Sequence, residues 1–77
     1  MAIGFWRQMK KHSLTLAGHR TSVSLEPEFW QAFRVLAEKR GLALNELARQ
    51  LDEGRDPSTG LASAIRLEIL ADLTRKP

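Results

Sequence analysis

Residues 18–30 read GHRTSVSLEPEFW, and this stretch decides the fold because a strand pattern gives way to a helix start within it. Polar and apolar residues alternate from His19 to Leu25, which predicts a half-buried β-strand. The apolar face of this strand consists of Thr21, Val23 and Leu25. The opposite face consists of Arg20, Ser22 and Ser24.

A first helix is expected from about Pro27 to Arg40. Proline suits the first helical position, where its missing N–H costs nothing, and Glu26 is the expected cap. Apolar residues recur at spacings of three and four and so share one face: Phe29, Ala32, Phe33, Leu36 and Ala37. Gly41 is expected just past the helix end, where a positive φ is common.

Two more helices follow. The second is expected from about Ala43 to Asp52, with a clean apolar stripe of Leu44, Leu47, Ala48 and Leu51. The turn-rich segment EGRDPSTG then leads to a third helix from about Ser58 to Leu73, with Ser58 or Asp56 as its cap. The chain is therefore predicted to be mainly α-helical with one short strand.

The predicted strand needs a pairing partner, because its backbone N–H and C=O groups would otherwise remain unsatisfied. Ser13 to Leu16 also alternates, and either extends the strand across Gly18 or lies separately; both arrangements stay open. No second convincing strand is found, so the partner strand is expected from a second copy. Two copies paired antiparallel about a two-fold axis would form an intermolecular two-stranded ribbon in an intertwined homodimer.

The composition argues against several classes of protein. A chain of this length forms one domain and buries only about 60% of its unfolded surface by itself. It contains no cysteine and only two histidines, His12 and His19, so no disulfide and no metal site are expected. No catalytic arrangement and no glycine-rich phosphate loop is found, so neither enzyme activity nor a cofactor is expected. No membrane-spanning run or signal-peptide pattern is found either, which favours a cytoplasmic protein.

The charge is unevenly distributed. Residues 1–25 carry a charge of +4 and no acid, whereas residues 26–77 hold eight basic and nine acidic side chains. Residues 1–12 are interpreted as a basic N-terminal arm, and residues 13–77 as the folded domain. The cations through which this arm could make contacts are Arg7, Lys10 and Lys11. Nucleic acid, a membrane surface and another protomer remain open as partners of the arm.

The segment HRTSVSLEPEFWQAFRVLAEKRGLALNELARQL resembles the ribbon-helix-helix DNA-binding proteins, the superfamily of the Met repressor and Arc. The shared features are an alternating strand ending in leucine, a proline near the start of the first helix, a glycine turn and an amphipathic second helix. LTLAGHRTSVSLEPEFW together with LASAIRLEIL is similar to a compact, mostly uncharacterised bacterial branch. The resemblance covers about Ser13 to Leu70, and the third helix is an addition to the minimal fold.

The resemblance implies sequence-specific binding of double-stranded DNA by the dimer ribbon in the major groove, in a repressor-like transcriptional regulator. The outward strand positions would contact bases, and these are Arg20, Ser22 and Ser24. Arg20 is the strongest candidate, because arginine can pair bidentately with guanine. The amino end of the second helix would bind a DNA phosphate near Ala43, Leu44 and Asn45. Many relatives have Ser or Thr at the position of Ala43, so either this clamp is weaker or Asn45 contributes instead.

Two other functions remain open. One is a dimerising protein-interaction module, such as an antitoxin, whose third helix binds a partner protein. Only DLTRKP follows that helix, which favours DNA binding over this alternative. The other is a membrane-surface head that would rest on the first eleven residues alone. Assembly of dimers into higher oligomers is open as well.

Several residues also have a purely structural interpretation. Arg20 and the two serines beside it would then be the solvated face of a half-buried strand. The aromatic residues of the first helix are expected in the core rather than as a base-stacking platform: Phe29, Trp30 and Phe33. His19 is expected to be a strand-end residue without a special role. Arg66 is expected to pair with Glu68 or with an acid of the second helix.

Overall fold

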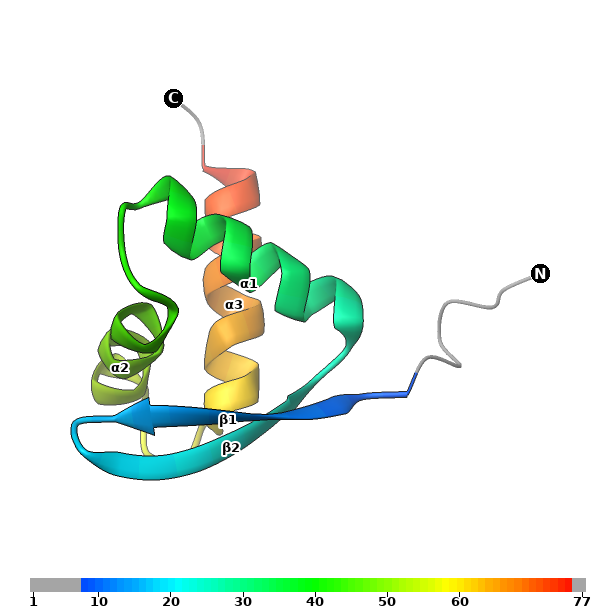
Figure 1. Cartoon of the computed structure of the whole chain (residues 1–77). Coiled ribbons are helices and arrows are strands. Elements are labelled where there is room, and N and C mark those ends of the chain that lie inside the picture. The colour runs from blue at the N-terminus through cyan, green and yellow to red at the C-terminus, as the bar shows by residue number, and fades with distance from the viewer. Residues whose placement is uncertain (1–7, 76–77) are drawn as a thin grey trace.

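The computed structural model describes residues 8–75. Two strands, β1 (Lys10–Leu16) and β2 (His19–Leu25), precede three helices, α1 (Pro27–Lys39), α2 (Leu44–Gly54) and α3 (Leu61–Thr74). Figure 1 shows the two strands along one side of the molecule, with all three helices on the same side of them. α3 starts near the strands and runs away from them, so its C-terminal half lies far from the sheet (Figure 1).

β1 and β2 pair antiparallel with each other within one chain. Leu16 lies opposite His19, so the loop between the strands consists of only two residues, Ala17 and Gly18. Both have positive φ angles, 51° for Ala17 and 84° for Gly18. Positive φ at both central positions defines the type I′ turn, whose twist matches that of a hairpin. The two-stranded ribbon is therefore closed by its own turn.

The prediction of a single strand was wrong, because β1 supplies a partner for β2 within the same chain. Pairing with a second copy stays a prediction. The open question about residues 13–16 is answered by a separate strand that begins at Lys10. The strand is hard to recognise because only its last residues alternate cleanly. Lys10 and His12 lie on the same face as Leu14, so the apolar face of β1 begins with two polar side chains.

α1 begins and ends close to the predicted positions. Glu26 occupies the N-cap position, but its side chain makes no capping hydrogen bond. At the other end Gly41 has a φ of 68°. The Gly41 N–H donates to the Glu38 carbonyl at 3.0 Å, and the Leu42 N–H donates to the Ala37 carbonyl at 2.9 Å. These two bonds form a Schellman motif, which confirms the expected role of Gly41.

α3 begins later than predicted. Its N-cap is Gly60, so the expected start at Ser58 was wrong, and neither Ser58 nor Asp56 caps the helix. Asp56 Oδ1 instead accepts hydrogen bonds from the Ser58 N–H at 2.8 Å and the Ser58 hydroxyl at 2.6 Å. This local turn satisfies both groups before the helix starts.

The core lies between the inner face of the hairpin and the three helices. Every element contributes buried apolar residues: Leu14, Leu16, Val23, Leu25, Phe33, Leu36, Ala37, Leu47, Ala48, Ile65 and Ile69. Leu25, Phe33, Leu47 and Ile65 are fully buried. Because one face of the hairpin is used for this core, the other face points to solvent.

Candidate nucleic-acid interface

The outward face of the hairpin is polar along its whole length. Directly opposite residues of an antiparallel pair lie on the same face. The register therefore joins three pairs of residues into one surface, which we call the ribbon face: Lys11 with Ser24, Ser13 with Ser22, and Thr15 with Arg20. Ser24 is half-buried and the other five are exposed.

The three base-contacting residues predicted from the sequence therefore share one exposed surface with three residues of β1. The sequence interpretation missed Ser13 and Thr15 and assigned Lys11 to the arm. Two signals could have identified them. Residues 13–16 alternate, and Ala17 and Gly18 then provide a two-residue loop, although alanine is a weak marker for a turn that needs positive φ angles.

The amino end of α2 lies beside β1. Asn45 Oδ1 accepts a hydrogen bond from the Thr15 backbone N–H at 3.2 Å, which places the predicted phosphate-binding residues next to the ribbon face. Ala43 is the N-cap and provides no side-chain cap. The N–H groups of Glu46 and Leu47 donate to the Ala43 carbonyl at 3.0 and 3.1 Å.

The first N–H groups of α2, those of Leu44 and Asn45, donate to no residue in the described part of the chain. Such N–H groups, together with the helix dipole, favour an anion at the start of a helix. The side-chain oxygen of Asn45, Oδ1, already accepts a hydrogen bond from β1. The side-chain nitrogen, Nδ2, is the part of Asn45 that can still donate to a phosphate.

The outer edge of β2 is open. The two residues that flank a two-residue loop form a hydrogen-bonded pair. From there along the hairpin, pairs without backbone hydrogen bonds alternate with hydrogen-bonded pairs. Arg20, Ser22 and Ser24 therefore direct their backbone N–H and C=O groups away from β1. No residue of the described range 8–75 forms a hydrogen bond with these groups. The corresponding edge of β1 is covered at Thr15 by Asn45.

The positive charges of the ribbon face are not neutralised by residues 8–75. No acid occurs before Glu26 in the sequence, and neither Lys11 nor Arg20 forms an ion pair with a described carboxylate. Acids on α3 are engaged elsewhere, since Asp72 pairs with Lys39 at 2.9 Å. The hydrogen bond from Lys39 lowers the pKa of Asp72 below its ordinary value. Hence the ribbon face presents its cations to solvent.

Arg66 has a structural role, as predicted, but with a different partner. Its Nε and Nη2 donate to Glu26 Oε1 at 3.1 and 2.7 Å, and its guanidinium lies 5.5 Å from the centre of the Phe29 ring. The hydrogen bond from Arg66 lowers the pKa of Glu26. Glu68 pairs with Arg40 instead, at 2.8 Å. Arg66 thus joins α3 to the start of α1.

The aromatic residues of α1 lie in and around the core. Phe33 is fully buried, and Phe29 and Trp30 pack against the core cluster. The Trp30 ring stacks on His12, with ring centres 3.7 Å apart and planes 4° apart. The prediction that these aromatics belong to the core rather than to a base-stacking platform is confirmed. His19 is exposed at the start of β2.

The predicted arm overlaps the fold. Lys10 and Lys11 lie in β1, so the expected boundary at residue 12 falls inside a strand. Lys11 belongs to the ribbon face, whereas Lys10 is exposed and lies opposite Leu25. Arg7 lies outside the described residues. Within residues 8–75, no group of His, Asp and Glu side chains could hold a metal ion, and no helix is long and apolar enough to cross a bilayer.

Comparison with protein families matches residues 9–73 to a family model described as a ribbon-helix-helix domain. The matched region contains the hairpin, α1, α2 and nearly all of α3. Neither the curated proteins nor the solved structures give a significant match.

Proposed function

Since the chain belongs to the ribbon-helix-helix family, we propose that it binds double-stranded DNA through the ribbon face and acts as a transcriptional regulator. One observation carries this proposal: the ribbon face is polar throughout, exposed, and has cations that no described carboxylate neutralises. Proteins of this family are generally DNA-binding regulators, so family membership and surface chemistry support the same function.

The hairpin is the part expected to enter DNA. The major groove of B-DNA admits a two-stranded β-ribbon, and base edges there differ in their donors and acceptors. Arg20 would donate two hydrogen bonds to guanine O6 and N7. Ser22 and Ser24 can donate or accept, so they would discriminate less between bases. Ser13 and Thr15 add hydroxyl groups from β1.

Phosphate groups would be bound on both sides of this contact. The free N–H groups of Leu44 and Asn45 are one expected phosphate site, because they lie at a helix start beside β1. Lys11 is a second expected phosphate site. It lies at one end of the ribbon face, and Arg20 lies at the other end. Arg7 and Lys10 would add further backbone contacts. Such contacts set the position of the protein on DNA without selecting a sequence.

The proposal includes a homodimer. The open edge of β2 can pair antiparallel with the same edge of a second copy, with Ser22 at the two-fold axis. Arg20 would then lie opposite the partner's Ser24, and Arg20, Ser22 and Ser24 would be presented twice at the centre of a larger sheet. Two-fold symmetry of the protein would correspond to a palindromic or repeated DNA element.

Fluorescence anisotropy tests the proposal directly. The purified protein is titrated against a duplex from its own upstream promoter and against a scrambled duplex, at two salt concentrations. We expect tighter binding to the promoter, and binding that weakens steeply as salt rises because phosphate contacts release counterions. Equally feeble binding of a well-folded protein to both duplexes would contradict the proposal.

One observation favours a second candidate function, a protein-interaction module that uses α3. Leu67, Leu70 and Leu73 of this helix are exposed. Feeble binding to both duplexes would turn attention to this helix and to a protein partner.

A further inference from the structure

α3 is apolar on both of its sides. Ile65 and Ile69 are buried in the core, whereas Leu67, Leu70 and Leu73 are 59%, 57% and 76% exposed. A helix that is apolar all round normally has protein all round it. Within residues 8–75, other parts of the chain pack against only one side of α3.

The exposed side of α3 carries one charged residue, Arg66, which pairs with Glu26 at 2.7 Å. Ser63, Leu67, Leu70 and Thr74 follow one another at spacings of four, three and four residues, the spacing of a coiled-coil seam. We call these four residues the α3 stripe. Small side chains at Ala64 and Ala71 adjoin it on one side. The stripe thus has the pattern of a helix–helix contact.

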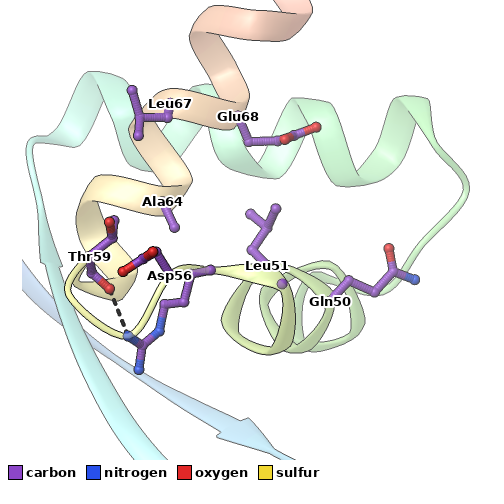
Figure 2. A pocket seen from close by; sticks show the side chains of 9 residues that line it. Gln50, Leu51, Asp56, Thr59, Ala64, Leu67 and Glu68 are labelled. Atoms are coloured by element: carbon purple, nitrogen blue, oxygen red, sulfur yellow. Dashed lines mark hydrogen bonds between the residues drawn. The ribbon is translucent and has the colours of Figure 1, made fainter.

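Two hollows lie beside the stripe. Figure 2 shows the one between α2 and α3, where Leu51 and Ala64 lie between the two helices and Leu67 stands at the rim. It has a volume of about 470 Å³. A second hollow, of about 250 Å³, lies between α1 and α3. Its apolar lining consists of Ala32, Val35, Leu36, Ile69 and Leu73. The surface around α3 therefore offers a projecting row of leucines with a hollow on each side.

Most charges that border this surface are already paired within the chain; Asp56, in the first hollow, is instead hydrogen-bonded to Ser58. Glu68 pairs with Arg40 at 2.8 Å, and Asp72 pairs with Lys39 at 2.9 Å. A strongly charged partner, such as DNA or an acidic peptide, would find little charge to complement here. Two identical surfaces can therefore approach with Asp56 of each first hollow as the unpaired charge.

We propose that the α3 stripe packs against the α3 stripe of a second copy of this chain. A two-fold interface requires a surface that is complementary to itself. The α3 surface meets this requirement, because its exposed leucines can enter the hollows that lie beside the same leucines in the other copy. A domain of this size also buries too little of its own surface to be far from marginal stability alone.

This contact is separate from the DNA-binding surface. α3 runs away from the sheet (Figure 1), and Leu70 and Leu73 belong to its C-terminal half. The ribbon face and the open edge of β2 therefore remain accessible when two α3 stripes are packed together. If both contacts form, the assembly contains four chains.

Sedimentation of the full-length protein without DNA tests the proposal. Leu67→Glu and Leu70→Glu would each place a charge in the apolar contact. We expect each variant to have half the mass of the wild-type particle. Arg34→Glu is the matched control, because Arg34 is exposed on α1 and lies outside the stripe and both hollows, and it should leave the mass unchanged. Since no DNA is present, the result does not depend on the proposed DNA-binding function.

A wild-type monomer, or α3 variants with the wild-type mass, would overturn the proposal. A cross-linking experiment decides the matter even if the glutamate variants unfold. The chain has no cysteine, so Leu70→Cys introduces a single thiol. A short bismaleimide should join Leu70→Cys chains into covalent pairs far more efficiently than Arg34→Cys chains. Equal yields from both variants would also overturn the proposal.

Discussion

Arg20 is the residue on which sequence discrimination is expected to depend. It is exposed on the ribbon face and lies opposite Thr15. Arg20→Ala should reduce the discrimination between promoter and scrambled duplex by about 1–3 kcal/mol, because a bidentate base contact is lost. Paired anisotropy titrations measure this difference. Arg34→Ala, which removes an exposed arginine from α1, is the control. If Arg20→Ala unfolds, or if it discriminates between the two duplexes as well as the wild type does, the assignment of Arg20 as a base-contacting residue is wrong.

His12 combines a favourable contact with an unfavourable one. Its ring stacks on Trp30, but its buried Nε2 has no hydrogen-bond partner among residues 8–75. A buried polar atom without a partner costs about 1–3 kcal/mol. His12→Phe keeps an aromatic ring and removes that atom, so we expect the free energy of unfolding to rise by about 1 kcal/mol in urea titrations. His12→Ala should lower it. A less stable His12→Phe protein would show that Nε2 is satisfied in solution.

At the scale of elements, the hairpin depends on its turn. Ala17 has a φ of 51°, a conformation that costs an ordinary L-residue roughly 1–2 kcal/mol. Asparagine tolerates this conformation, and Asn-Gly is the preferred type I′ sequence. Ala17→Asn should therefore stabilise the protein by about 1 kcal/mol in thermal or urea unfolding. A destabilised Ala17→Asn protein would mean that the turn differs in solution.

The contact between α1 and α3 should depend on pH. The hydrogen bond from Arg66 lowers the pKa of Glu26 from an ordinary value of 4.5. Because folded Glu26 then binds fewer protons than unfolded Glu26, its contribution to stability is present above about pH 4.5 and is lost as pH falls through the folded-state pKa. Urea unfolding from neutral pH to well below this range should show a weaker pH dependence for Glu26→Gln than for wild type. Arg66→Gln, which removes the donor of that hydrogen bond, should weaken the pH dependence in the same way, and an unchanged dependence in both variants would contradict the prediction.

The elements differ in how well the sequence predicted them. α1 and α2 were located within about two residues, because apolar spacing and the turn at Gly41 are local signals. β1 was missed because two polar residues, Lys10 and His12, interrupt its apolar face. His12 is a partner of the core because its ring stacks on Trp30, and no local sequence pattern reveals this tertiary contact. α3 begins at Leu61 rather than Ser58 because Asp56 binds Ser58 in a turn of its own.

In the candidate site as well, the features set by local sequence patterns could be predicted and those set by tertiary contacts could not. The outward orientation of Arg20, Ser22 and Ser24 could be predicted from the period of two along β2. Ser13 and Thr15 could not, because their membership of the ribbon face depends on the register of a hairpin. The hydrogen bond between Asn45 and Thr15 joins residues 30 positions apart, and no pattern of residue spacing predicts it.

For the whole molecule, the separation of charge should govern salt dependence. The cations of the strands form no ion pair with a described acid, whereas acids of the helices pair with helix cations. Lys11→Gln should weaken binding to promoter and scrambled duplexes by the same factor. It should also reduce the slope of log K against log salt concentration by about 1, the value for one phosphate contact. A loss confined to the promoter would instead make Lys11 a base-contacting residue.

The turn at Ala17 and Gly18 also bears on how the protein would behave at low copy number. A ribbon built from two chains disappears when the protein is diluted below the concentration at which its chains associate. A ribbon closed within one chain persists at any dilution. Occupancy of a single half-site would then rise in simple proportion to the number of molecules in the cell, and association of copies would sharpen the response to abundance rather than create the capacity to recognise DNA.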